Sequence, residues 1–65
     1  MSIADSIEQL DHALTASELA RILKVHKLTI YRQAHSGTLP CFRIGTAVRF
    51  DPRAVAAWLR AQETV

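Results

Sequence analysis

The sequence predicts a small α+β fold, mainly α, in which two short helices precede a two-stranded β-hairpin and a C-terminal helix. Three local patterns predict it. Thr15 followed three residues later by Glu18 forms a capping box, which marks a helix start. Apolar and polar residues alternate on both sides of Gly45, as they do in a hairpin. Asp51 followed by Pro52 is an N-cap with proline at the first helical position.

Length and composition restrict what the chain can do. With 65 residues, 49% of them hydrophobic and 22% charged, it forms one small folded domain and is too short for most enzymes. The single cysteine, Cys41, excludes an internal disulfide, and the three histidines are not spaced like zinc ligands. No apolar run reaches the length of a membrane span, and the N-terminus is unlike a signal peptide. We expect a cytoplasmic binding module that has no enzymatic activity, cofactor, metal or small-molecule substrate.

Residues 1–13 form an acidic lead that is either a short helix or a flexible segment. Apolar residues recur at helical intervals along it, at Ile3, Ile7 and Leu10, and the pattern continues to Leu14 directly after it. All 8 Lys and Arg residues lie within 19–60, where Asp51 is the one acid, whereas 1–18 hold Asp5, Glu8, Asp11 and Glu18. This asymmetry favours a polyanionic partner.

Two helices joined by a tight turn are predicted over about 16–24 and 27–35. Ile30 and Ala34 turn inward in the second helix, which Ser36 and Gly37 end. This is a helix-turn-helix, in which the first helix braces the second so that the second can enter the DNA major groove. At 100° per residue, the face opposite Ile30 carries Leu28, Arg32 and His35, flanked by Lys27, Thr29 and Tyr31.

The predicted hairpin has its loop at 45–47. We expect Arg43 to lie directly opposite Arg49 on one face, and the apolar face to pair Ile44 with Val48 and Phe42 with Phe50. Two opposed like charges are unfavourable unless an anion such as a DNA phosphate lies between them. The alternative is that both arginine side chains splay into water.

The last helix is predicted from Asp51 to about Gln62. Val55, Trp58 and Leu59 share one face, so we expect Trp58 to fill the core under the hairpin. Arg53 and Arg60 lie elsewhere on the helix, where they contact phosphate or only keep the surface soluble. The expected organisation is the lead at 1–13, a DNA-binding domain at 14–62 and a tail at 63–65.

The segment from Leu14 to Leu59 resembles the excisionase-type, MerR-like winged helix-turn-helix domains. The likeness lies in LTASELA, VHKLTIYR, SGTLP and RIG, the Arg49-Phe50 pair and Trp58-Leu59. It implies a bacterial or phage-encoded, nucleoid-associated protein that binds double-stranded DNA as a recombination directionality factor or a small transcriptional regulator. It also implies DNA contacts from the recognition helix at Lys27, Leu28 and Arg32, a backbone contact at Tyr31, and wing contacts at Arg43 and Arg49.

Four residues depart from the family pattern. Lys24 stands in the turn where Gly or Asn is common, and His26 stands where Ser or Thr often caps the second helix. Gln33 replaces a hydrophobic residue, so the helix packs less firmly or Gln33 itself bonds a base. Leu28 replaces a small polar residue and offers only apolar contact, which favours a thymine methyl. The resemblance therefore does not supply the target sequence.

The alternative function is a protein-interaction adaptor that docks on an integrase or a polymerase subunit without binding DNA. A steep salt dependence of duplex binding separates the two. Because the chain ends six residues after Leu59, too few for a dimerising coiled coil, we expect a monomer in solution. Several copies would then bind neighbouring DNA sites, the acidic lead of one copy meeting the basic surface of the next.

Overall fold

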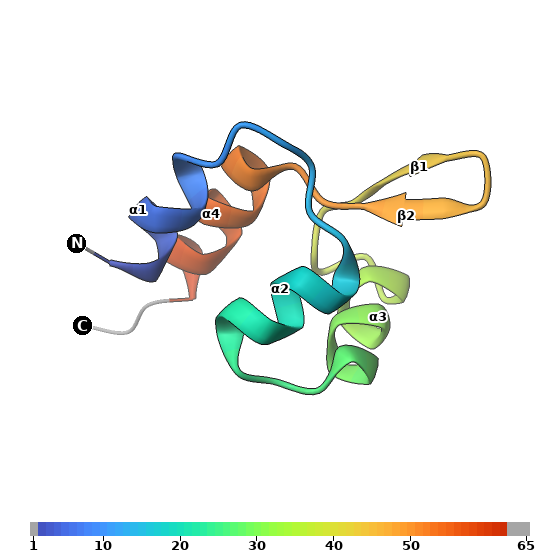
Figure 1. Ribbon diagram of the computed structural model, residues 1–65. Helices are drawn as coiled ribbons and strands as arrows, with labels where there is room; N and C mark the ends of the chain where they lie inside the picture. Colours follow the sequence, from blue (N-terminus) through green and yellow to red (C-terminus); the bar gives the residue numbers. More distant parts are fainter. Residues whose placement is uncertain (1, 63–65) are drawn as a thin grey trace.

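A computed structural model describes residues 2–62 and contains helices and one hairpin in the predicted order. The elements are α1 (Ile3–Glu8), α2 (Ala16–Leu23), α3 (Lys27–His35), β1 (Phe42–Ile44), β2 (Ala47–Arg49) and α4 (Pro52–Ala61). Helix α1 packs beside α4 and α2 packs against α3, while the hairpin extends away from the helices (Figure 1). The predicted class, a mainly helical α+β winged helix-turn-helix, is confirmed. The expected tail at 63–65 lies outside the described residues.

The helix starts follow from local capping groups. At α2 the Thr15 N–H donates to Glu18 Oε1 (2.9 Å) and the Glu18 N–H donates to Thr15 Oγ1 (3.1 Å), which is the predicted capping box. At α4 Asp51 accepts from the Ala54 N–H (3.2 Å), with proline at the first helical position as predicted. Ser2 caps α1 in the same manner as Thr15 caps α2, so the acidic lead contains a helix. Each such cap contributes about 1 kcal/mol.

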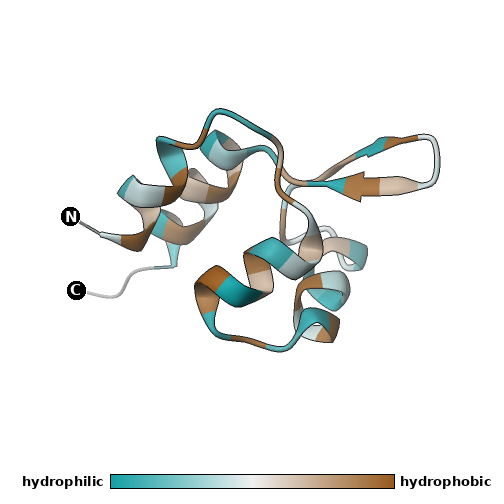
Figure 2. Ribbon diagram, in the orientation of Figure 1, coloured by the Kyte–Doolittle hydropathy of each residue, from teal (hydrophilic) through white to brown (hydrophobic). Residues whose placement is uncertain are grey.

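The core joins every helix to the end of the hairpin. Its most buried large side chains are Phe50, Ile7, Leu14, Leu19, Ile30, Leu39 and Val55. The backbones of Leu14 and Phe50 exchange two hydrogen bonds of 2.9 Å, which tie the loop after α1 to the strand that leads into α4. Trp58 packs against this core but stays half-buried. Each helix in Figure 2 carries both hydrophobic and hydrophilic residues, as expected for helices with one buried side.

The hairpin register differs by one residue from the predicted one. Arg43 pairs with Val48, Phe42 with Arg49 and Ile44 with Ala47. The prediction assumed a three-residue loop, whereas the strands are joined by the two residues Gly45 and Thr46. Gly45 has a φ of 62° and stands first in the turn, where a type II′ turn requires glycine.

This shift changes which face each hairpin side chain occupies, because neighbouring residues of a strand point to opposite faces. Arg43 and Arg49 therefore lie on opposite faces, and the predicted like-charge pair does not exist. Phe42 does not join Phe50 in the core and is 39% exposed.

Within residues 2–62, no helix is long and apolar enough to cross a membrane. The same part of the chain has no group of three or more His, Cys, Asp or Glu side chains able to hold a metal ion.

Candidate nucleic-acid interface

The turn between α2 and α3 is built on Lys24. The backbone of this residue is left-handed, with a φ of 59°. This conformation explains why Gly or Asn is common at this position of the family. The Val25 N–H donates to the Ala20 carbonyl (3.0 Å) and the Lys24 N–H donates to the Arg21 carbonyl (3.4 Å), which together form a Schellman motif. The motif satisfies carbonyls at the end of α2 and turns the chain sharply into α3.

Helix α3 is capped by a histidine. The His26 Nδ1 atom accepts a hydrogen bond from the Leu28 N–H at 3.1 Å. The ring can accept this bond only while Nδ1 carries no proton. His26 thus caps the helix as Ser or Thr more commonly does, and it stabilises the first turn of α3.

The outward face of α3 matches the face predicted from helical periodicity. Ile30 is only 2% exposed and holds the helix on the core. The exposed residues of α3 are the six predicted ones, Lys27, Leu28, Thr29, Tyr31, Arg32 and His35, together with Gln33. Helix α3 contains no acidic residue. Its solvent face is therefore basic and polar, apart from Leu28, which is 48% exposed, and the ring of Tyr31.

Gln33 is occupied by the turn that follows α3. Its side-chain oxygen accepts from the Thr38 hydroxyl (2.6 Å), and its carbonyl accepts from the hydroxyls of Ser36 and Thr38 at 3.0 Å each. Gly37, with a φ of 83°, completes the turn. Gln33 thus orients the chain from α3 toward the hairpin, a role that neither sequence interpretation of this residue contained.

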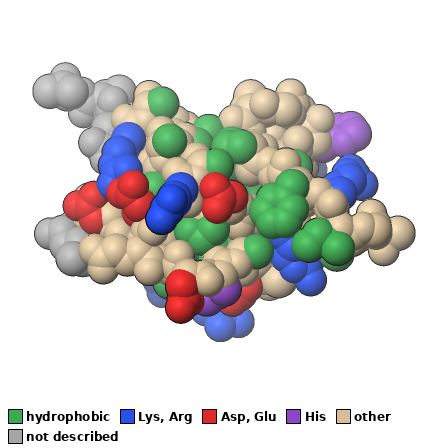
Figure 3. Space-filling model, turned by 90° about the horizontal axis from the view of Figure 1, so that it is seen from above, with side chains coloured by type: hydrophobic (Ala, Val, Ile, Leu, Met, Phe, Trp, Pro, Cys, Tyr) green, Lys and Arg blue, Asp and Glu red, His purple; other side chains and the backbone are tan. Residues whose placement is uncertain are grey.

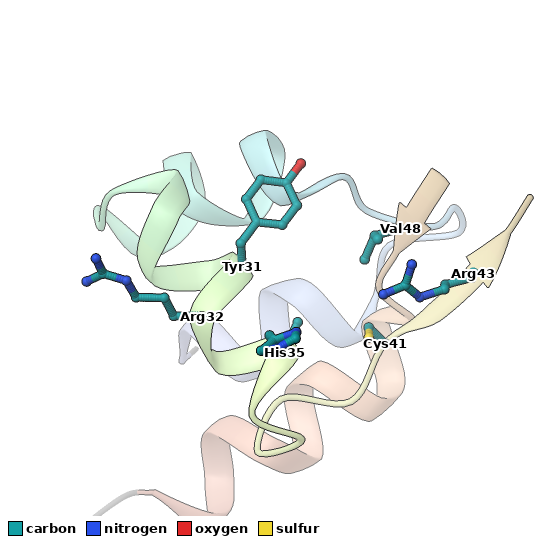
Figure 4. Close-up of a pocket in the computed structure, with 7 residues that line it drawn as sticks. Tyr31, Arg32, His35, Cys41, Arg43 and Val48 are labelled. Atoms are coloured by element: carbon teal, nitrogen blue, oxygen red, sulfur yellow. The ribbon is translucent and has the colours of Figure 1, made fainter. Parts of the chain in front are cut away.

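A cleft of about 430 Å³ separates α3 from the hairpin. Tyr31, Ala34 and His35 line it from α3, together with Arg32, and the hairpin side contributes Cys41, Arg43 and Val48. In Figure 4 the Arg43 guanidinium points toward the cleft, whereas the Arg32 side chain points away from it along the other side of α3. The two arginines therefore offer cations on two sides of the same helix.

Arg49 is placed differently from Arg43. It lies on the other hairpin face, is half-buried, and its Nη1 atom donates to the Val48 carbonyl at 2.8 Å. Of the eight predicted site residues, Tyr31, His35 and Arg43 meet at the cleft, and Arg32 borders it with its side chain turned away. Lys27, Leu28 and Thr29 continue the exposed face of α3 toward its N-terminus, and Arg49 lies apart from both groups.

Sequence reasoning missed three cleft residues: Ala34, which was expected to turn inward, and the hairpin-side residues Cys41 and Val48. The two hairpin-side residues share one feature. Both lie on the Arg43 face of the hairpin, because alternation places Cys41 with Arg43 and pairing places Val48 opposite Arg43. The signal that identifies them is the glycine at the first position of a two-residue turn, since this turn fixes the register.

Charge is distributed unevenly over the molecule. Arg60 donates to Asp5 Oδ1 (2.6 Å) and Glu8 Oε1 (2.7 Å), which joins α4 to α1. The hydrogen bond from Arg60, followed by that from the Ser2 N–H, lowers the pKa of Asp5. The hydrogen bonds to Glu8 and Asp5 raise the pKa of Arg60. In Figure 3 acidic and basic side chains lie next to one another on the side of the molecule where Figure 1 shows α1 and α4.

The cations of α3 and the cleft lack such partners in the described part of the chain, where the ion pairs are those of Arg60. Lys27, Arg32 and Arg43 thus keep their positive charge available. Arg60, by contrast, is neutralised within the chain, which argues against the phosphate contact considered for it. Asp5 and Glu8 are likewise engaged within the chain. They are therefore not free to meet the basic surface of a second copy, which is the contact that we expected the acidic lead to make.

Comparison with known proteins yields one family and three relatives. A family model described as a helix-turn-helix domain matches residues 13–63. Over 42 residues the chain is 43% identical to "Putative DNA-binding protein MT0521" and "Putative DNA-binding protein Rv0500A" from two strains of Mycobacterium tuberculosis, which covers 65% of this chain and 54% of each relative. Over 37 residues it is 46% identical to "Uncharacterized protein YvgK" of Bacillus subtilis, which covers 57% of this chain and 12% of that protein. The chain thus spans about half the length of the two mycobacterial relatives. No solved structure matches it.

Proposed function

Since this chain belongs to the helix-turn-helix domain family, we propose that it binds double-stranded DNA with α3 in the major groove and the hairpin beside it. The observation that carries this proposal is the solvent face of α3, which is basic, free of acids and continuous with the cleft that Arg43 enters. The similarity to two proteins named as DNA-binding supports it.

Each predicted site residue of α3 has a chemically reasonable role in this complex. Arg32 lies near the middle of the outward face, where a guanidinium can make a bidentate contact with guanine N7 and O6. Lys27 lies at the helix N-terminus, where the helix dipole also attracts a phosphate. Thr29 and Leu28 lie in the first turns, within reach of base edges.

The cleft suits the sugar-phosphate backbone at the edge of the groove. The Tyr31 hydroxyl and the His35 ring supply hydrogen-bond groups on one side, and the Arg43 guanidinium supplies a cation on the other. We assign the main wing contact to Arg43. Arg49, which bonds its own strand from the opposite face, is assigned at most a minor contact.

The biological role within DNA binding belongs to the same proposal. Residues 14–62 serve as the DNA-binding unit, and the protein acts as an excisionase-like recombination directionality factor or a small transcriptional regulator. These roles differ in where the bound sites lie, because the contacts with DNA are the same. Mapping bound sites relative to recombination sites and promoters distinguishes them.

A second candidate function, an adaptor that binds a protein such as an integrase or another copy, rests on the outer face of the hairpin. Ile44 is 65% exposed there and Phe42 is 39% exposed. In Figure 3 hydrophobic side chains are visible on the hairpin side of the molecule as well as over the helices. Apolar groups exposed together are typical of protein contacts.

Salt-dependent binding to selected and random duplexes tests the proposal. We expect log K to fall steeply with log salt concentration, because several phosphate contacts release counterions. Arg32→Ala should weaken binding to the selected duplex by roughly 1 to 3 kcal/mol and relax its sequence preference.

Arg53→Ala is the control for loss of one exposed cation. Arg53 lies on α4 in a hollow that it shares with the 10–13 loop and Phe42 and with no residue of α3, so the proposed complex assigns it no DNA contact. A chain that does not bind duplex DNA, or an Arg32→Ala variant that binds both duplexes like the parent, contradicts the proposal. Absence of duplex binding together with capture of an integrase would favour the adaptor.

A further inference from the structure

Leu28 is the one large aliphatic side chain on the proposed DNA-reading face of α3. It is 48% exposed and does not belong to the core or to the hydrophobic residues packed against it. Its backbone N–H is held by His26 Nδ1 at 3.1 Å, so the residue is fixed in the first turn of the helix. The Leu28 side chain therefore makes no contribution to the core of the described residues.

Base edges in the major groove differ in the apolar groups that they offer. Thymine presents a C5-methyl group where cytosine has only a hydrogen atom, and the other groups that distinguish the bases there are hydrogen-bond donors and acceptors. A leucine can neither donate nor accept a hydrogen bond, so burial against a methyl group is the contact that distinguishes one base from another. We propose that Leu28 makes the domain select a thymine through its C5-methyl group, an inference that rests on the proposed function.

The position of Arg32 predicts how far this thymine lies from the guanine that Arg32 contacts. Arg32 follows Leu28 by four residues, so the two side chains lie on one helix face. Four residues of α-helix rise about 6 Å. Successive base pairs are about 3.4 Å apart. The thymine contacted by Leu28 therefore lies about two base pairs from the guanine contacted by Arg32.

The cations around Leu28 favour DNA over an apolar protein partner at this spot. Lys27 precedes it, Arg32 lies one turn further along, and Arg43 lies across the cleft from α3. A protein surface covering Leu28 would also have to neutralise these charges. The DNA backbone supplies the required anions on both sides of the groove.

Replacement of thymine by uracil tests the proposal, because it removes the methyl group and leaves pairing unchanged. A tight-binding duplex is first selected from a random pool, and each thymine is then replaced by deoxyuridine in turn. We expect one replacement, about two base pairs from a guanine, to weaken binding roughly fourfold, the loss for one buried methyl-sized group. In Leu28→Ala the thymine and uracil duplexes should bind equally at that position.

Matched variants separate this effect from a folding defect. Leu28→Ala is made at an exposed helical position and introduces a better helix former, so its thermal melt should match the parent. Ile3→Ala removes an aliphatic side chain that is 51% exposed on α1, and it should keep the full preference for thymine.

The outcomes are distinguishable. Failure to select any duplex overturns the proposed function itself. Selective binding without a uracil effect at any position, or a thymine preference that survives in Leu28→Ala, overturns the role of Leu28 and leaves DNA binding intact. A selected site without thymine at this distance from a guanine overturns it as well. Because 5-methylcytosine carries the same methyl group, a C·G pair is tested with and without methylation, and tighter binding of 5-methylcytosine than of thymine overturns the assignment to thymine.

Discussion

The opposite placement of the two hairpin arginines predicts unequal effects on DNA binding. Arg43 points toward the cleft beside α3, whereas Arg49 lies on the other face and donates to the Val48 carbonyl at 2.8 Å. If Arg43 neutralises one phosphate, Arg43→Ala should reduce the slope of log K against log salt concentration by about 0.9. That slope change corresponds to a loss in affinity of about fivefold at 0.15 M salt and about 15-fold at 0.05 M. Arg49→Ala should change the slope by much less.

Fluorescence anisotropy with a labelled duplex at several salt concentrations measures both quantities. The two variants remove the same side chain from adjacent strands, so each serves as a control for loss of net charge. Equal slopes for Arg43→Ala and Arg49→Ala would show that charge alone matters and that the hairpin face does not. A slope unchanged in Arg43→Ala would place the cleft away from the DNA backbone.

Three further predictions concern the scaffold that holds the interface. Lys24→Gly should raise the free energy of unfolding by about 0.5 to 1 kcal/mol in urea denaturation, because it relieves a side chain at a φ of 59°. His26→Ala should lower it by roughly 0.5 to 2 kcal/mol and His26→Asn should preserve it, because asparagine also caps a helix; equal loss in both would refute the cap. The lowered pKa of Asp5 means that its pairing with Arg60 stabilises the fold above the ordinary aspartate pKa of 3.8, and that this contribution disappears as pH falls through the lower folded value. Thermal melts between about pH 2 and 5 should show this loss in the parent and a smaller one in Asp5→Asn.

Local signals explain what could be predicted from the sequence. The Thr15 and Glu18 capping box, the Asp51 cap and the apolar spacing around Ile30 act within one or two helical turns, and the structure confirms each of them. Such signals are read from neighbouring residues, so they need no knowledge of the rest of the fold. The exposed face of α3 followed directly from them.

The features that the sequence did not predict correctly depend on the hairpin register and on contacts between distant residues. A difference of one residue in loop length decides whether Arg43 and Arg49 share a hairpin face. The alternation of apolar residues is partly kept with either loop length, so it did not identify the correct register. The contact of Arg60 with Asp5 joins residues 55 positions apart, which helical periodicity does not encode. Both errors concerned the partners of charged side chains, so the sequence located the cations without showing which of them are free.

The pairing of Arg60 has a consequence for how the protein meets DNA. The formal net charge is only +2 because acids cancel most of the cations. Part of this cancellation is local, since Asp5 and Glu8 pair with Arg60 at the junction of α1 and α4, whereas Lys27, Arg32 and Arg43 remain exposed on α3 and the hairpin. A molecule charged on one side is turned by the field of a polyanion before contact. In the proposed complex, the acidic lead thus favours approach of the α3 side to DNA, even though it takes no part in the proposed contact.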